Sequence, residues 1–346
     1  MPRILSFLAL ILLLSAPADA ASLYTGEVHV ERGARTGTTE QLGALDQVLA
    51  RLTGRFDRSL VDELGLGPAD LDDLVLSQQL VRRDVVGPEG ESRESLHLQV
   101  EFDEPSINAL LKRSELARWG RERPAVLLWA VVEDEYGTRF IENARLEWVI
   151  RDQARRVGLD VVRPLRDAMD LSEISPQDVR GGFLGSAEES ARRYGTGVIA
   201  MLDLRLQEPD TEEPWWTGRW RWRVGGQESG LNHSGSDPET LIRDGLGRLA
   251  STLAARYAVI DLDGEPARWQ LTVSGIVDEV QYAEVLRYLD NLSVVDDVRV
   301  ASAEGRQVTF EVLAAGQDLE TYLGLGGLLE LERREGERQL HFRLVR

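Results

Sequence analysis

Residues 126–132 read Val-Leu-Leu-Trp-Ala-Val-Val, an apolar run without polar alternation. A strand that is apolar on both faces is typical of a sheet covered on both sides, as in α/β folds. The following residues 142–157 carry apolar side chains at helical spacing and stop at Gly158. A short strand and another helix come next, and residues 198–206 form a further apolar strand. This β-α-β-α-β alternation predicts an α/β layer over residues 121–261.

The rest of that middle module is predicted from local signals. Residues 219–224 look like a hairpin strand, which we expect at the edge of the sheet. Asp237 followed by Pro238 is a typical helix start, because proline suits the first helical position. Linkers are expected near Gly120 and over residues 261–266.

A third module is expected over residues 266–346. Its apolar periodicities predict strands at 269–275, 294–301, 307–313, 328–332 and 339–345, and helices at 278–289 and 319–323. The order indicates the β-α-β-β-α-β motif of ferredoxin-like domains.

A first module is expected over residues 21–118. The predicted elements are a strand at 23–30, a helix at 39–52 that stops at Gly54, a short helix at 68–76, paired strands at 78–86 and 95–102, and a closing helix from Pro105 to Leu116. The chain is therefore predicted to be α+β and α/β, in three small modules, of which the middle one is an α/β layer.

The N-terminal residues 1–20 have the pattern of a secretory signal peptide. Arg3 provides a positive charge, residues 4–14 are apolar except for Ser6, and residues 18–20 read Ala-Asp-Ala, which favours cleavage after Ala20. The next residue is Ala21 and not cysteine, so a lipid anchor is not expected. The alternative is an uncleaved membrane anchor, although the apolar run is shorter than a membrane span of about 20 residues.

Composition narrows the possible functions. After signal cleavage no apolar stretch approaches membrane length, so we expect a soluble protein of the bacterial periplasm. The chain has no cysteine, which excludes disulfides, thiol catalysis and thiolate metal sites. Its formal net charge of −19 repels phosphate backbones, so nucleic acid is not an expected partner.

The stretch from Trp215 to Arg223 is the strongest candidate for a binding surface. At strand spacing the residues divide between two faces: Trp216, Trp220 and Trp222 on one, and Arg219, Arg221 and Arg223 on the other. Tryptophan beside arginine can bind glycans or peptide carboxylates. The alternative is a half-buried strand with its tryptophans in the core and its arginines in water.

Other motifs carry little weight as sites. Residues 195–200 fit the Gly-x-Gly-x-x-Ala pattern of a dinucleotide loop, yet a helix precedes them and a strand follows, the reverse of what that loop requires. An acidic stretch at 261–265 suits a solvated linker better than a calcium loop. No catalytic, cofactor or metal site is therefore predicted.

Histidine and serine patterns likewise nominate no site. The four histidines are far apart in sequence and form no local zinc motif: His29, His97, His233 and His341. Sequence order leaves a Ser-His-Asp arrangement open, although no Gly-x-Ser-x-Gly elbow nominates a serine. A hydrolase therefore remains a third possibility.

Several short motifs, taken in order, resemble the proteobacterial family DUF2066. They are residues 45–54 (Leu-Asp-Gln-Val-Leu-Ala-Arg-Leu-Thr-Gly), 100–103 (Val-Glu-Phe-Asp), 119–120 (Trp-Gly), 123–124 (Arg-Pro), 127–129 (Leu-Leu-Trp) and 193–195 (Arg-Tyr-Gly). The resemblance implies an envelope protein and brings no catalytic residues with it. More loosely, the middle module looks like the α/β domains of TolB, CsgG and LpoB, which are used for protein contacts.

These observations predict a non-enzymatic periplasmic accessory or scaffold protein that binds another envelope protein. The alternative is a module that binds a glycan or peptidoglycan fragment through the Trp/Arg strand. Neither alternative requires a cofactor, and the oligomeric state is left open.

Overall fold

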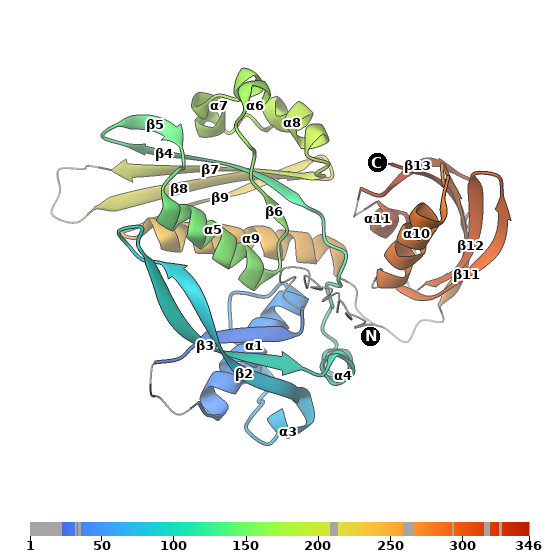
Figure 1. Ribbon diagram of the computed structural model, residues 1–346, viewed down its shortest axis with the longest axis horizontal. Coiled ribbons are helices and arrows are strands. Elements are labelled where there is room, and N and C mark those ends of the chain that lie inside the picture. The colour runs from blue at the N-terminus through green and yellow to red at the C-terminus, as the bar shows by residue number, and fades with distance from the viewer. Residues whose placement is uncertain are drawn as a thin grey trace, which may run out of the picture.

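The computed structural model describes residues 23–31, 33, 36–207, 214–258, 266–292, 294–314, 319–324 and 327–345. Helices and three separate sheets follow one another along the chain, so the predicted mixed α+β class is confirmed (Figure 1). The predicted signal segment 1–20, residues 208–213 and most of the predicted 261–266 linker lie outside the described residues.

The first sheet has three antiparallel strands in the order β1-β3-β2. Its elements are β1 (Thr25–His29), α1 (Thr38–Thr53), α2 (Leu60–Glu63), α3 (Leu71–Leu74), β2 (Val75–Val86), β3 (Ser92–Phe102) and α4 (Glu104–Arg113). Alternate β3 side chains, Leu98, Val100 and Phe102, are buried in a core that also contains the apolar face of α1. The first helix ends at Gly54 as predicted, with the left-handed φ of 71° that favours glycine.

The middle sheet has the order β5-β4-β7-β8-β9, with the short β6 beside β4. Its strands are β4 (Val126–Asp134), β5 (Gly137–Phe140), β6 (Val161–Val162), β7 (Val198–Gln207), β8 (Trp215–Val224) and β9 (Gln227–Gly235), and its helices are α5 (Ala144–Val157), α6 (Ala168–Glu173), α7 (Pro176–Gly181), the 3-10 turn η1 (Leu184–Ala187), α8 (Glu188–Arg193) and α9 (Pro238–Tyr257). Strands β4, β6 and β7 are parallel, as the β-α-β-α-β reading requires.

Helices cover both faces of this sheet (Figure 1). Leu128, Ala130 and Val132 of β4 share one core with α5 and α9. Their neighbours Leu127, Trp129 and Val131 point the other way, into a second core below α7 and η1. The apolar run 126–132 is thus explained, because each of its faces meets a different layer of helices.

The prediction that residues 219–224 form an edge strand is wrong. Strand β8 pairs with β7 on one side and with β9 on the other, so β9 is the edge. Residues 227–235 read Gln-Glu-Ser-Gly-Leu-Asn-His-Ser-Gly, in which only Leu231 is apolar. A solvated outer strand needs no apolar alternation, so the pattern gave no sign of it.

The last sheet has five strands in the order β11-β12-β10-β14-β13. Its elements are β10 (Ala267–Ser274), α10 (Glu279–Asn291), β11 (Val295–Glu304), β12 (Gln307–Ala314), α11 (Leu319–Leu323), β13 (Leu329–Arg334) and β14 (Gln339–Leu344). The expected β-α-β-β-α-β order is present with one strand added. Because β13 turns back into β14, the strand that pairs with β10 is β14, and it runs parallel to β10.

Two arginines, the buried Arg51 and the half-buried Arg123, join the first sheet's helix to the middle module. Arg51 at the end of α1 donates to the carbonyls of Arg156, Leu23 and Thr25. Arg123 lies 4.0 Å from the centre of the Trp119 ring and donates to several backbone carbonyls. Those carbonyls belong to Arg51, Trp119, Gly120, Val157 and Gly158. A cation is stabilised there because the last carbonyls of α1 and α5 both need donors.

Candidate functional site

The six side chains of the predicted Trp/Arg surface lie on β8, and the structure separates them by face. Trp220 and Trp222 are 0% and 1% exposed, in the core between the sheet and α9. The Trp220 indole donates to the carbonyl of Leu241 at 3.2 Å, and Trp216 packs against the same core. The two central indoles are therefore packing residues that a ligand cannot reach.

The arginine face of β8 lies toward α7 and α8, where each guanidinium has partners on neighbouring elements. Arg219 pairs with Asp203, Arg221 donates to Asn232, and Arg223 pairs with Glu188 and Glu228. Burial raises the pKa of Asp203, and the guanidiniums of Arg219 and Arg205 oppose that rise. The interpretation with buried tryptophans agrees with this arrangement, although the arginines are half-buried and paired with neighbouring side chains.

The remaining sequence motifs lie apart from one another. Gly195 follows α8 and precedes β7, so no helix begins at the Gly-x-Gly stretch. Within the described ranges, no group of three or more histidines or carboxylates could hold a metal ion. None of the helices in those ranges combines the length and the apolar character that crossing a membrane requires.

A more open arrangement lies on the first sheet, where β1 ends before β3 does. The last contact between the two strands is the hydrogen bond from the Val30 amide to the Leu96 carbonyl, 2.8 Å long. Beyond it, residues 92–95 of β3 pair with β2 on one side only. One side of this part of β3 therefore has no strand partner among the described residues.

The direction of the free backbone groups follows from the pairing. The amide of Phe102 donates to Tyr24, and the carbonyl of Leu96 accepts from Val30, so even-numbered β3 residues point their backbone groups toward β1. In an antiparallel sheet the backbone groups of alternate residues point to the same side. Glu94 therefore directs its amide and its carbonyl toward the open side, next to Leu96.

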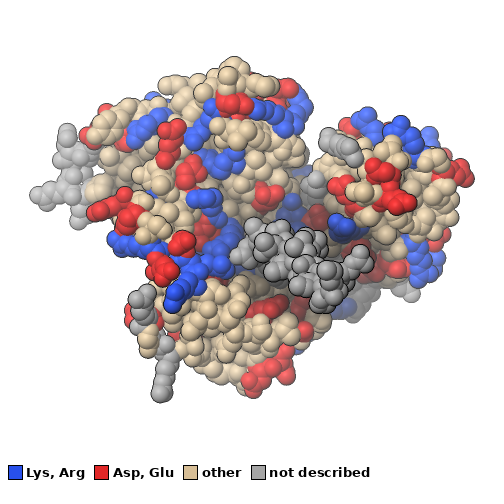
Figure 2. All heavy atoms as spheres, in the orientation of Figure 1, with Lys and Arg blue, Asp and Glu red and all other residues tan. Residues whose placement is uncertain are grey.

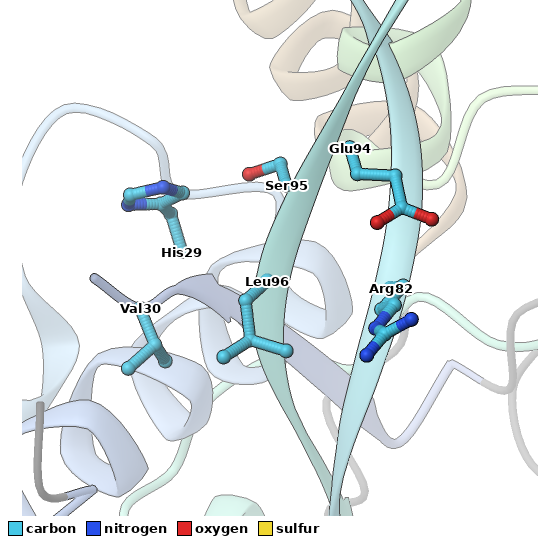
Figure 3. Close-up of a pocket in the computed structure, with 6 residues that line it drawn as sticks. All are labelled: His29, Val30, Arg82, Glu94, Ser95 and Leu96. Atoms are coloured by element: carbon cyan, nitrogen blue, oxygen red, sulfur yellow. The ribbon is translucent and has the colours of Figure 1, made fainter. Parts of the chain in front are cut away.

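A cavity of about 540 Å³ lies at this place. Its described lining consists of His29, Val30, Arg82, Glu94, Ser95 and Leu96. Figure 3 shows His29 and Ser95 in the upper part of the view and Val30 and Leu96 in the lower part, with Glu94 and Arg82 on the right; Arg82 lies on β2, opposite Leu96. The volume is in the range of ligand sites, but the lining is more polar than is usual for a small-molecule pocket.

His97 contacts two of the residues that line the cavity, His29 and Ser95. Its Nε2 lies 3.0 Å from the Ser95 hydroxyl, and its Nδ1 lies 3.5 Å from a carboxylate oxygen of Glu27. Burial lowers the pKa of His97, against the opposite effect of Glu27, so the neutral ring is favoured at neutral pH. Serine, neutral histidine and carboxylate are the components of a nucleophilic triad.

Basic side chains gather where the β2–β3 hairpin meets α5, as Figure 2 shows. Arg83 lies 2.9 Å from Glu27, and Arg155 lies 3.6 Å from the same carboxylate. At the end of the hairpin, Arg145 contacts Glu239 at 2.7 Å and also donates to the carbonyl of Val86. The Arg155–Glu27 pair and the donation from Arg145 to Val86 join the first sheet to α5.

The sequence did not point to this site. His29 and His97 are far apart in the chain and come together because β1 and β3 pair in register, with ring centres 5.7 Å apart. Glu27 lies two residues before His29 on β1, and Ser95 lies two residues before His97 on β3, so both share that face of the sheet. A register between the predicted strands at 23–30 and 95–102 would have been the signal, and no turn connects those strands directly to specify it.

Comparison with protein families concerns the part of the chain that contains this cavity. Residues 18–120 match the model of a domain of unknown function, DUF8605. No curated protein matches the chain.

The resemblance to DUF2066 is wrong, because the family that matches is a different one. The quoted motifs are short, and the structure gives several of them packing roles. Leu45, Val48 and Leu49 fill the first core, Trp129 lies in a core of the middle sheet, and Arg123 binds helix ends. With that resemblance the envelope assignment loses its support from a family, and the N-terminal signal remains as its basis.

Proposed function

We propose that this protein is a non-enzymatic accessory protein of the bacterial periplasm that binds an extended segment of another envelope protein. The observation that carries the proposal is the open side of β3 at residues 92–95. Its backbone groups are unpaired by any described strand, and a cavity of about 540 Å³ lies beside them. A partner segment could continue the sheet where β1 leaves it, which is a common mode of peptide recognition.

The chemistry of the cavity favours a polypeptide over a glycan. An extended peptide supplies backbone donors and acceptors that match those of Glu94, and its side chains alternate between the two sides of the strand. On one side they would meet His29 and Ser95, and on the other Val30 and Leu96. The glycan alternative depended on stacking surfaces of Trp220 and Trp222, which are buried.

The periplasmic part of the proposal rests on residues 1–20, with their positive start, apolar run and Ala-Asp-Ala ending. Its test is the N-terminal sequence of the protein recovered from the periplasmic fraction. We expect it to begin at Ala21. A protein found only in the cytosol with residues 1–20 attached would contradict this part.

A photo-crosslinking amino acid at position 95 tests the binding part in intact cells. The matched control carries the same group at Ser229, a serine on the exposed edge strand β9. We expect one reproducible crosslinked protein from position 95 and none of that species from position 229. The same products from both positions, or none from either, would count against a partner at this site.

The geometry of Ser95, His97 and Glu27 calls for a test of hydrolysis as well. We expect the purified protein to leave p-nitrophenyl esters unchanged and to remain unlabelled by a fluorophosphonate. An activity that disappears in Ser95→Ala while binding persists would show an enzyme and would overturn the non-enzymatic assignment.

A further inference from the structure

Strand β2 forms the other side of the first sheet and has a free edge of its own. It spans twelve residues and pairs only with β3 among the described strands. Because even-numbered β3 residues direct their backbone groups toward β1, the β2 residues opposite them direct theirs away from the sheet. These are Gln78, Leu80, Arg82 and Asp84, which face Val100, Leu98, Leu96 and Glu94.

The side chains along this edge are exposed to solvent. The Leu80 side chain is 55% exposed, and Arg82 and Asp84 are also exposed. Long edge strands with accessible apolar side chains tend to pair with another strand. The side chains along the edge therefore indicate which strand would fit it.

Residues 80–86 are complementary to themselves when they run antiparallel. They read Leu-Val-Arg-Arg-Asp-Val-Val, with apolar residues at both ends and opposite charges on either side of Arg83. Two such segments centred on Arg83 would place Leu80 opposite Val86, Val81 opposite Val85, and Arg82 opposite Asp84, each pair twice. Apolar pairs and opposite-charge pairs across strands are the combinations that stabilise a sheet.

Neighbouring registers lack this match. Centring the pair on Arg82 would place Leu80 opposite Asp84, and centring it on Asp84 would place Arg82 opposite Val86. In both cases a charged group would lie against an apolar one. The complementarity thus selects one register as well as one kind of partner.

We propose that two copies of this chain associate through their β2 edges in the register centred on Arg83, which joins the two first sheets into one. Arg83 meets its own copy at the centre, where Glu27 holds its charge at 2.9 Å. The carbonyl of Val86 already accepts from Arg145, so the pairing ends at that residue. A contact of one strand is small, and the association should be weak and dependent on concentration.

Charge exchange tests this pairing by sedimentation of the protein purified from expressing cells. We expect a monomer–dimer equilibrium in the parent, and a dissociation constant raised about tenfold or more in Arg82→Asp and in Asp84→Arg, because each change creates two like-charge pairs. The double variant Arg82→Asp/Asp84→Arg restores opposite charges and should return the dimer. Thermal unfolding of all three variants controls for misfolding.

Two results would overturn the inference. One is a parent protein that stays monomeric up to about 0.5 mM, a concentration that covers weak interfaces of this size. The other is a double variant that fails to recover the dimer while remaining folded. The crosslink at Ser95 forms on the β1 side of β3, whereas the dimer uses the outer edge of β2. Arg82 lines the cavity together with Ser95 and Asp84 does not, so Asp84→Arg is the variant that separates the failure of one proposal from that of the other.

Discussion

The middle sheet and the first sheet place their polar residues in opposite ways. In the middle sheet, helices cover both faces, and the arginines of β8 are paired with Asp203, Glu188 and Glu228. In the first sheet, strands of unequal length leave backbone groups of β3 beside a cavity without a partner strand among the described residues. The Trp and Arg residues that stand out in the sequence therefore serve packing in the middle sheet. In the first sheet, residues without a noticeable sequence pattern form the accessible site. Accessibility depends on where strand pairing stops.

The largest effect is expected in the middle sheet, on replacing Trp220 by alanine. The side chain is completely buried, and the Cβ of any residue in place of Gly245 would lie 2.0 Å from its ring. We expect a loss of about 3–5 kcal/mol in the free energy of unfolding, measured by urea denaturation. The control Trp216→Ala, at the partly buried end of the same face, should cost clearly less. Equal losses of unfolding free energy in the two variants would mean that the complete burial of Trp220 adds no stability.

A smaller loss is expected where the two sheets meet, on replacing Arg123 by methionine. The change leaves helix-terminal carbonyls of Arg51 and Gly158 without their donor. We expect about 2–4 kcal/mol of destabilisation in urea, within the cost of leaving buried polar groups unpaired. Arg121→Met, at an exposed ion pair with Glu104, is the control and should cost less than about 1 kcal/mol. An unchanged Arg123 variant would show that water replaces the guanidinium.

At the open side of β3, Glu94→Pro should act on binding more than on folding. The amide of Glu94 points away from β2, so proline removes a donor that the sheet itself does not use. We expect the crosslink from position 95 to fall by roughly tenfold, the effect of about 1–1.5 kcal/mol for a lost hydrogen bond. Glu94→Ala keeps the amide and should retain the crosslink. A loss in both variants would assign recognition to the carboxylate.

The smallest effect is a pH dependence from His97. Its pKa is lowered in the folded protein, so the unfolded chain takes up a proton first as the pH falls. The contribution of neutral His97 to the free energy of unfolding is therefore fully present above about pH 6.5, the ordinary pKa of histidine. It is lost as the pH falls from there toward the lowered pKa of His97 in the folded protein. Denaturation between pH 7.5 and about 5.5 should show a steeper loss in the parent than in His97→Gln. Parallel curves would mean that the ring is not held neutral.

Most secondary structure was predictable, because strong periodicity marks elements with one buried face. The helix α1, the strand β4 and the proline start of α9 are near their predicted places. The polar strand β9 and the short helices α6 and α7 escaped prediction, because elements this short or this solvated carry little apolar pattern.

The candidate site was less predictable than the fold. It depends on which residues of β1 lie opposite β3 and on where that pairing ends, and both are tertiary facts. The division of β8 into a tryptophan face and an arginine face was correct at the level of alternation. Predicting the burial of the two faces of β8 required knowing that α9 lies over one face of the sheet and α7 over the other.

The end of α1 has a consequence for how the chain can be divided. Trp119 donates its amide to Leu52 at 2.6 Å, and Arg123 donates to Arg51, so the helix is completed by residues that follow position 118. In a fragment that stops at residue 118, the carbonyls of Leu52 and Arg51 would lose these donors, and the Arg51 guanidinium would lose its acceptor, the carbonyl of Arg156. We therefore expect proteolysis or gene fusion to leave a folded N-terminal part when the break lies beyond α9, and to unfold it when the break lies near Gly120. The sequence suggests a linker at Gly120, but these hydrogen bonds connect the residues on either side of it.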